Sequence, residues 1–267
     1  MSEADYVEPA TPRPAATIVL LRDAPDGMEV LLMRRSRSAG FVPGAYVFPG
    51  GRVDGSDATS EALECLDGLT PPEAAERLDL IGAVPPAIAY YLAALREAFE
   101  ETGILVGLRD DGSAPPTAAE DPTVDTIRDD LMEGRITFAE AVARMRCRIP
   151  GESVAYFAHW ITPTPEPRRY DTRFFAAKVR EGATPIVDPR EMTDGLWATP
   201  AQALAGVDDG SLPMIFPTIK TLEQLAPFAT AREALDAISR ERVRTIMPTL
   251  IVTHGGVAMH LDDESSS

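Results

Sequence analysis

The chain has 267 residues, of which 45% are apolar and 25% are charged, a balance typical of a folded globular protein. Its 42 Asp and Glu outnumber 25 Lys and Arg, and the net charge of −17 argues against nucleic acid or an anionic membrane as a partner. Two cysteines argue against a disulfide framework and against a CxxC metal site.

The sequence carries no targeting signal of a familiar kind. Its first residues, MSEADYVEPATPRP, are acidic and proline-rich and lack the apolar run of a signal peptide. Its apolar stretches are far too short to span a membrane, and its C-terminal serines form no peroxisomal address. We therefore expect a cytoplasmic protein that acts on a small molecule, and a homodimer is compatible with the sequence.

Composition along the chain predicts three parts. Residues 1–14 form a flexible N-terminal arm, residues 15–205 form the main domain, and residues 206–267 form a helical C-terminal extension and tail. Two segments of the main domain look like additions. Segment 58–95 contains inserted helical material, and segment 116–150 forms a second helical insert.

The first elements of the main domain are strands. Apolar and β-branched runs at 15–22 and 29–34 flank the turn-forming DAPDG and predict a hairpin. The sequence AYVFPGG then predicts a short strand that ends in the glycine pair Gly50 and Gly51. A strong helix pattern begins after the insert at Pro86.

The rest of the chain alternates between helix and strand patterns. The strong helix ends at Gly103, and ILVGL at 104–108 predicts a strand. Two further helices at 121–146 precede strands at 153–162 and 168–179, and a mostly helical stretch then runs through Glu241. This order predicts a mixed α/β sandwich with helical inserts.

The strong helix gathers three carboxylates on one face. In LREAFEETGILV, Glu97, Glu100 and Glu101 lie at the spacings that place side chains side by side on a helix. Like charges at these spacings repel each other, so a cation would stabilise them. Convergent carboxylates suit Mg²⁺ or Mn²⁺. The alternative is an ordinary solvated face on which Arg96 offers local pairing.

The string R-E-x-x-E-E-x-G, together with the upstream FPGGRVDGSD, resembles the box of the Nudix hydrolases, G-x5-E-x7-R-E-U-x-E-E-x-G-U, where U is apolar. The positions that match the box are Gly51, Arg96, Glu97, Glu100, Glu101, Gly103 and Ile104. Asp57 stands where the box has its first Glu, and 38 residues separate Asp57 from Arg96 where the box has seven. This split box is similar to the branch that includes the mammalian peroxisomal coenzyme A diphosphatase.

The resemblance implies a Nudix-type α/β/α sandwich with a mixed sheet, a helical insertion within the box and a helical C-terminal extension. It further implies hydrolysis of a nucleoside diphosphate linked to a second group, with Mg²⁺ or Mn²⁺ held by Glu97, Glu100 and Glu101. By the same analogy Arg96 fixes the helix to the glycine loop. For the general base, the interpretation leaves open Glu97, Glu101 and Glu191.

Two roles stay open for Asp57. It could accept a hydrogen bond from Arg96, whereas its short side chain leaves direct metal ligation open. Tyr170 and Arg173, in the strand pattern at 168–179, are candidate pocket residues.

A second signature lies just before the box. The coenzyme A diphosphatases have L-L-T-x-R-S-x3-R-x3-G-x3-F-P-G-G, and LLMRRSRSAGFVPGAYVFPGG keeps most of it, with Met33 for Thr and Gly40 for the second Arg. The residues kept in register are Leu31, Leu32, Arg35, Ser36, Gly44 and Phe48 through Gly51. Substrate binding is predicted for Gly50, Gly51 and the basic patch of Arg34, Arg35 and Arg37, because guanidinium groups suit phosphates. These arginines could instead pair with surface acids.

Three functions compete on this basis. The leading hypothesis is a Nudix diphosphatase that cleaves coenzyme A or acyl-coenzyme A into 3′,5′-ADP and 4′-phosphopantetheine. A hydrolase of ADP-ribose or of a dinucleotide such as NADH is the second, and a non-catalytic nucleotide-binding module of the same fold is the third. A module without activity has no need for three mutually repelling glutamates, which argues against the third hypothesis.

Overall fold

A central sheet carries most of the strands of the molecule. The computed structural model describes residues 9–37, 42–187, 192–253 and 256–260. Its eight-stranded sheet is made of β1 (Arg13–Ala24), β2 (Gly27–Arg35), β3 (Tyr46–Val47), β4 (Gly50–Arg52), β8 (Val154–Ile161), β9 (Tyr170–Lys178), β10 (Met192–Ala198) and β11 (Thr245–Ile246). The strand order is β10-β2-β1-β9-β8-β11, with β3 beside β2 and β4 beside β1.

The sheet is mixed, as predicted. Strand β1 pairs in parallel with β9, and β8 pairs in parallel with β11, whereas the other pairings are antiparallel. Strand β1 is long enough to hold two partners along the same edge. Its last residues pair with β2, and Ala15–Thr17 pair with β4. This arrangement brings Gly50 and Gly51 next to the middle of the sheet.

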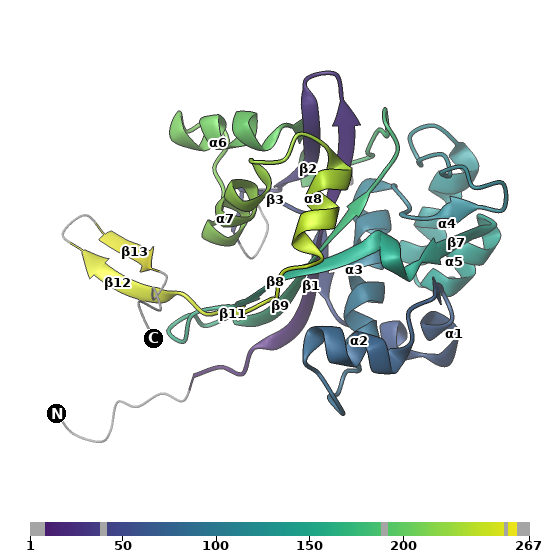
Figure 1. The fold of residues 1–267 in the computed structure, drawn as a ribbon, viewed down its shortest axis with the longest axis horizontal. Helices are drawn as coiled ribbons and strands as arrows, with labels where there is room; N and C mark the ends of the chain where they lie inside the picture. Colours follow the sequence, from purple (N-terminus) through teal and green to yellow (C-terminus); the bar gives the residue numbers. More distant parts are fainter. Residues whose placement is uncertain (1–8, 38–41, 188–191, 254–255, 261–267) are drawn as a thin grey trace.

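Helices cover both faces of the sheet (Figure 1). One layer holds η2 (Gly55–Ala58), α1 (Ser60–Leu63), α2 (Pro71–Leu78), α3 (Ala87–Thr102), α4 (Pro122–Met132) and α5 (Phe138–Arg144), with β5 (Leu66–Asp67), β6 (Leu108–Arg109), β7 (Cys147–Pro150) and η3 (Gly151–Ser153). The other holds α6 (Pro200–Asp208), α7 (Phe216–Leu225) and α8 (Ala231–Ile238). Each layer packs on the sheet through its own apolar cluster, so the predicted α/β/α sandwich is confirmed.

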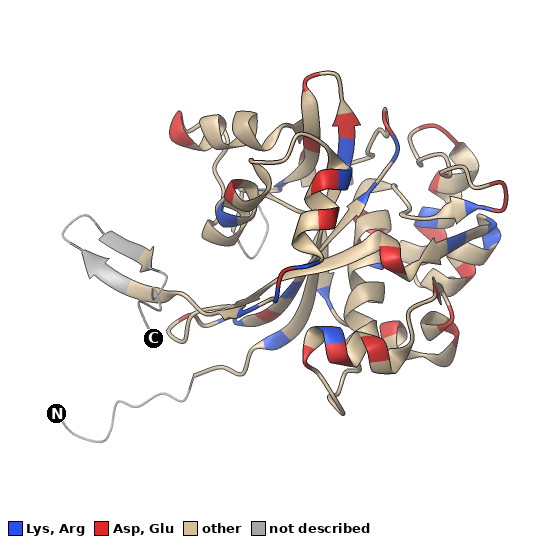
Figure 2. Ribbon diagram, in the orientation of Figure 1, with Lys and Arg blue, Asp and Glu red and all other residues tan. Residues whose placement is uncertain are grey.

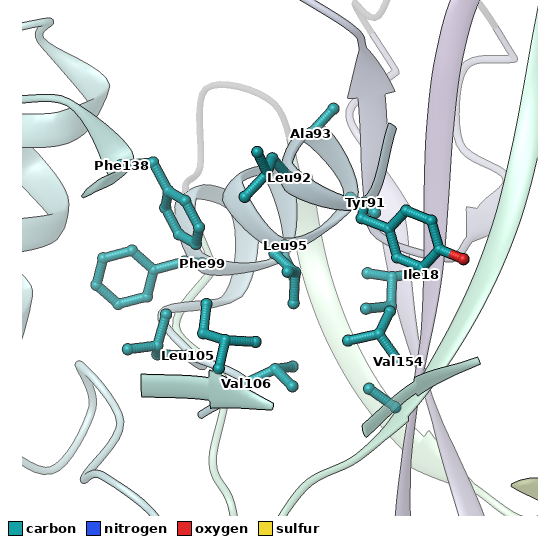
Figure 3. Close-up of a cluster of buried hydrophobic side chains, with 14 of the residues drawn as sticks. Ile18, Tyr91, Leu92, Ala93, Leu95, Phe99, Leu105, Val106, Phe138 and Val154 are labelled. Atoms are coloured by element: carbon teal, nitrogen blue, oxygen red, sulfur yellow. The ribbon is translucent and has the colours of Figure 1, made fainter. Parts of the chain in front are cut away.

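Helix α3 is the buried axis of the first layer. Pro86 occupies its N-cap position, and Gly103 ends it in the left-handed region with φ +67°. Figure 3 shows Tyr91, Leu95 and Phe99 of this helix in the apolar cluster. Burying such a side chain contributes about 1.5–3 kcal/mol. The buried apolar side of α3 thereby sets the direction in which its polar side faces.

The predicted strand at 104–108 is wrong for most of its length. Only Leu108 is part of β6, whereas Ile104, Leu105 and Val106 are buried without a strand partner. Figure 3 shows Leu105 and Val106 beside Phe99. A short apolar run predicts burial, but its pattern does not distinguish a strand from a connecting segment inside the core.

The C-terminal extension is helical as predicted as far as α8, but the chain beyond α8 is not helical. Helices α6 to α8 end at Ile238, and the chain then forms β11, β12 (Thr249–Thr253) and β13 (Gly256–His260). The last two strands pair as a separate antiparallel hairpin. The β-branched residues of TLIVT favour a strand over a helix. At the other end, β1 begins at Arg13, and residues 1–8 of the predicted arm lie outside the described residues.

Asp and Glu residues occur on helices of both layers (Figure 2). Within the described ranges, no helix combines the length and the apolar character needed to cross a bilayer.

Candidate active site

The glycine pair of β4 lies against the carboxylates of α3. The Gly50 N–H donates a hydrogen bond to Glu101 Oε2 at 3.1 Å. A Cβ added at Gly50 would come within 2.7 Å of the Thr17 Cα, and one added at Gly51 would collide with the Glu97 carboxylate. Glycine at position 50 therefore allows β4 to lie this close to β1, and glycine at position 51 leaves room for the Glu97 carboxylate.

Arg96 joins the two halves of the split box. Its Nε and Nη2 donate to the Asp57 carboxylate at 2.8 and 3.1 Å, and Nη2 also donates to the Arg52 carbonyl at 3.0 Å. Arg96 is 7% exposed and Asp57 is 2% exposed. Asp57 also accepts the backbone N–H of Asp54 at 2.8 Å, which caps η2. The hydrogen bond that the sequence allowed between Asp57 and Arg96 is confirmed.

Arg96 also reaches the glutamates of its own helix. Its Nη1 donates to Glu97 Oε1 at 3.0 Å and to Glu100 Oε2 at 2.9 Å. Burial nevertheless raises the pKa of Glu97 to about 7. The attraction of Arg96 opposes this rise, but the charge of Glu100 partly cancels that attraction. Burial also raises the pKa of Glu100. One guanidinium thus contacts three carboxylates, those of Glu97, Glu100 and Asp57, and supplies a single positive charge to them.

The carboxylates suit a divalent cation but are not gathered around one point. Within the part of the chain that the structure describes, no three Asp, Glu, His or Cys side chains are arranged to hold a metal ion. Arg96 holds Glu97 and Glu100, while Glu101 is turned toward Gly50. The donor set fits a hard cation because its oxygens are anionic and partly buried. The glutamate side chains would have to rotate to bring their carboxylates together around one ion.

A cleft of about 590 Å³ opens beside these residues. Gly50, Gly51, Glu97 and Glu101 line it together, whereas Glu100 is not among its lining residues. The sheet forms the floor of the cleft. The sheet residues that line the cleft include Ala15, Thr17, Trp160, Thr172 and Phe174. The predicted glycine loop and two of the three predicted metal ligands, Glu97 and Glu101, therefore share one cavity.

The predicted basic patch is divided by the alternation of β2. Arg35 lines the cleft. Arg34, on the opposite face, lies 5.6 Å from the Tyr46 ring centroid and donates to the Gly44 carbonyl at 3.4 Å. Arg37 lies beyond the strand end and is exposed. Among the described residues that line the cleft, Arg34 and Arg37 are absent, so substrate binding by the whole patch is not supported.

The two candidate pocket residues of β9, Tyr170 and Arg173, lie on opposite faces of the sheet. Tyr170 lines the cleft, but Arg173 points to the other face of the sheet because neighbouring strand residues alternate. There Arg173 is 4% exposed, donates to Asp171 at 3.0 Å and lies 5.7 Å from the Tyr90 ring centroid. The prediction of Arg173 as a pocket residue is therefore wrong. Glu191, the third candidate base, lies outside the described residues.

Several residues that line the cleft were not predicted from the sequence. Arg52 follows the glycine pair, Trp160 comes from β8, and Met259 comes from the C-terminal hairpin. Of these, Arg52 was within reach of sequence reasoning, since it directly follows the glycine pair. The others enter the site only through the path of the chain in three dimensions.

Residues 8–225 match the family model described as the NUDT19 Nudix domain. The chain belongs to the Nudix hydrolase family. The acyl-coenzyme A diphosphatase NUDT19 of Xenopus laevis is 26% identical, over 86% of this chain and 68% of that protein. The human protein of the same name is 27% identical, over 88% of this chain and 71% of its own.

A crystal structure of a Nudix hydrolase from Alicyclobacillus acidocaldarius is similar in both sequence and fold. It is 27% identical, has a TM-score of 0.70, and the match covers 87% of this chain and 99% of the other. The resemblance noted in the sequence is thereby confirmed, and so is the enzyme class. Nudix hydrolases generally use divalent metal ions.

The raised pKa of Glu97 predicts how the stability of the metal-free Nudix hydrolase depends on pH. Its pKa is near 4.5 when exposed and about 7 in the fold, so the folded state binds the extra proton between these values. The free energy of unfolding should therefore fall from pH 4.5 to pH 7, by up to about 3 kcal/mol from this group. Urea unfolding in EDTA at pH 5 and pH 7.5 measures the change. Glu97→Gln should show a clearly shallower dependence, and an equal slope in both proteins would contradict the assignment.

Proposed function

We propose that this Nudix hydrolase cleaves the diphosphate of coenzyme A and acyl-coenzyme A to give 3′,5′-ADP and 4′-phosphopantetheine. The observation that carries the proposal is the shared cleft, in which Arg35 and Phe48 of the coenzyme A-type signature line the same cavity as Glu97 and Glu101. The acyl-coenzyme A diphosphatases named above match most of the chain, which supports the same substrate class.

Glu97, Glu100 and Glu101 are the proposed metal ligands, with Mg²⁺ or Mn²⁺ as the ion. Such an ion would polarise the diphosphate and lower the pKa of a bound water. Arg96 would position helix α3, since its hydrogen bonds to Asp57 and to the Arg52 carbonyl hold α3 against the glycine loop. Asp57 is fully engaged in that contact, which favours a structural role over metal ligation.

Glu97 and Glu101 are the proposed candidates for the general base, because both line the cleft. Glu101 is 7% exposed and is held by the Gly50 N–H, so its carboxylate has a fixed direction. Burial raises the pKa of Glu97 to about 7 in the metal-free protein, which suits proton transfer near neutral pH only in a state in which Glu97 does not bind the ion. Glu191 stays a third candidate.

Arg35 and Arg52 are proposed to recognise the phosphates, since both line the cleft of an otherwise acidic protein. Guanidinium groups bind phosphate oxygens in pairs, and the 3′-phosphate of coenzyme A needs such a partner. Tyr170, which also lines the cleft, offers a ring to the adenine. ADP-ribose and dinucleotides have the same diphosphate but lack the 3′-phosphate, so they are the second candidates.

A matched substrate panel tests the proposal. Initial rates with Mg²⁺ would be measured for coenzyme A, 3′-dephospho-coenzyme A, ADP-ribose and NADH, and the products identified by mass. We expect the highest kcat/KM for coenzyme A, with an advantage of about tenfold or more over the dephospho form. Arg35→Gln should reduce that advantage, because it removes one phosphate partner. A higher kcat/KM for ADP-ribose would overturn the substrate and keep the enzyme class.

The setting of the enzyme is a further part of the proposal. We propose a cytoplasmic location and a free small molecule as the substrate. Nucleic acid is not expected as a partner, because the net charge of −17 repels polyanions. The homodimer stays a prediction.

A further inference from the structure

The two sides of the cleft differ in chemical character. On the side of β2 and β4, the cationic Arg35 and Arg52 line the cleft beside the apolar Val47 and Phe48. On the side of β8 and β11, the lining residues include Pro163, Pro248 and Met259. The side with the arginines also holds the glycine pair and the carboxylates, so the reacting diphosphate would lie nearer to it.

The apolar side also contains one acidic group. Glu166, in the connection between β8 and β9, lines the cleft there. A carboxylate repels a phosphate dianion, so the nucleotide half of the substrate is disfavoured at this end. The pantetheine arm carries no charge, and its amide N–H groups can donate hydrogen bonds to a carboxylate. The charges therefore favour one direction of binding.

The C-terminal strands contribute to this apolar side because β11 is fixed to the sheet edge. Strand β11 pairs in parallel with β8, and the Thr245 hydroxyl lies 2.8 Å from His159 Nδ1. Arg169 Nη2 donates to the Met247 sulfur at 3.6 Å. Figure 1 shows β11 running along β8 and leading into the β12–β13 hairpin. Pro248 follows directly, and Met259 returns to the cleft from β13.

We propose that Pro248 and Met259, together with Pro163, form the subsite for the acyl-pantetheine arm, and that the arginine side holds the 3′,5′-ADP half. The inference rests on the proposed function and adds a direction of binding and a determinant of acyl preference. Pro248 and Met259 lie beyond residue 225, where the family match ends. Acyl preference is thus set by a part of the chain outside the matched domain.

Met259→Asp tests this subsite by placing a charge on its apolar wall. Met259 is 38% exposed, so the substitution should not disturb the core. We expect the ratio of kcat/KM for dodecanoyl-coenzyme A to that for coenzyme A to fall about tenfold or more, mainly through KM, because a fatty chain loses its apolar contact. Met259→Ala, which adds no charge, should lower the same ratio by a smaller factor. The matched control is Ile81→Asp, at a site that is 83% exposed and away from the cleft lining, and it should leave the ratio unchanged.

The outcomes separate this inference from the function on which it rests. An unchanged ratio in folded Met259→Asp, with coenzyme A still hydrolysed, would overturn the subsite alone. No hydrolysis of any coenzyme A compound by the wild type would overturn both. Calorimetric affinities for dodecanoyl-coenzyme A and coenzyme A, measured in a Glu101→Gln background, should show the same loss for Met259→Asp. Equal affinity losses for the two compounds would contradict a subsite that recognises the acyl arm.

Discussion

Glu101→Gln is expected to lower kcat for coenzyme A hydrolysis by about 10³-fold, with little change in the fold. Glu101 lines the cleft and is held by the Gly50 N–H. The amide keeps the size of the side chain and removes the charge that a divalent cation and a proton acceptor require. Both candidate roles of Glu101 therefore predict a large loss.

Steady-state kinetics at saturating Mg²⁺ measures this loss, and circular dichroism checks the fold. Glu76→Gln is the matched control, because Glu76 is an exposed helical glutamate of α2 that does not line the cleft. Its kcat should stay at the wild-type value. If Glu101→Gln kept more than about a tenth of the activity, the site would have to lie on other residues.

Arg96→Leu is expected to lower the free energy of unfolding by about 3–5 kcal/mol, since removing one partner of a buried ion pair leaves the other uncompensated. Asp57 is 2% exposed and would keep its charge without the two bonds from Arg96. Glu97 and Glu100 would lose the same neighbour. Repulsion among these carboxylates adds to the loss.

Urea unfolding of a double-mutant cycle measures the coupling between Arg96 and Asp57. Arg96→Leu combined with Asp57→Leu should cost clearly less than the sum of the two single changes. The control is Arg135→Leu, whose ion pair with Asp130 is half exposed and should contribute less than about 1 kcal/mol. Additive costs at Arg96 and Asp57 would show that their contact does not hold the two halves of the box together.

The sequence predicted α3 and its partners well because the relevant signals are local. Pro86 and Gly103 mark the ends of the helix by their own backbone preferences, and both positions behave as expected. Spacing along a helix also determines that Glu97 and Glu100 share a face. The bond of Arg96 to Asp57 across 38 residues was within reach only through the resemblance to the Nudix box.

Other features depend on how distant segments of the chain are arranged in the fold, and local sequence patterns do not predict this arrangement. Both Arg34 and Arg35 satisfy the charge that a phosphate needs, but only the pairing of β2 determines which of them faces the cleft. The prediction of Arg173 as a pocket residue was wrong for the same reason, because alternation along β9 directs its side chain to the other face of the sheet. Met259 carries no chemical signature at all, and it reaches the cleft only because β11 turns the chain back toward β8.

The proposed activity requires that the carboxylates of α3 bind the divalent cation. Anomalous diffraction from crystals grown with Mn²⁺ and coenzyme A, using Glu101→Gln to prevent turnover, locates the ion directly. We predict a peak within about 2.5 Å of carboxylate oxygens of Glu97 or Glu100, on the side of the cleft that holds Gly50 and Gly51. Bound Mn²⁺ at another place, with none beside these glutamates, would contradict the proposed active site.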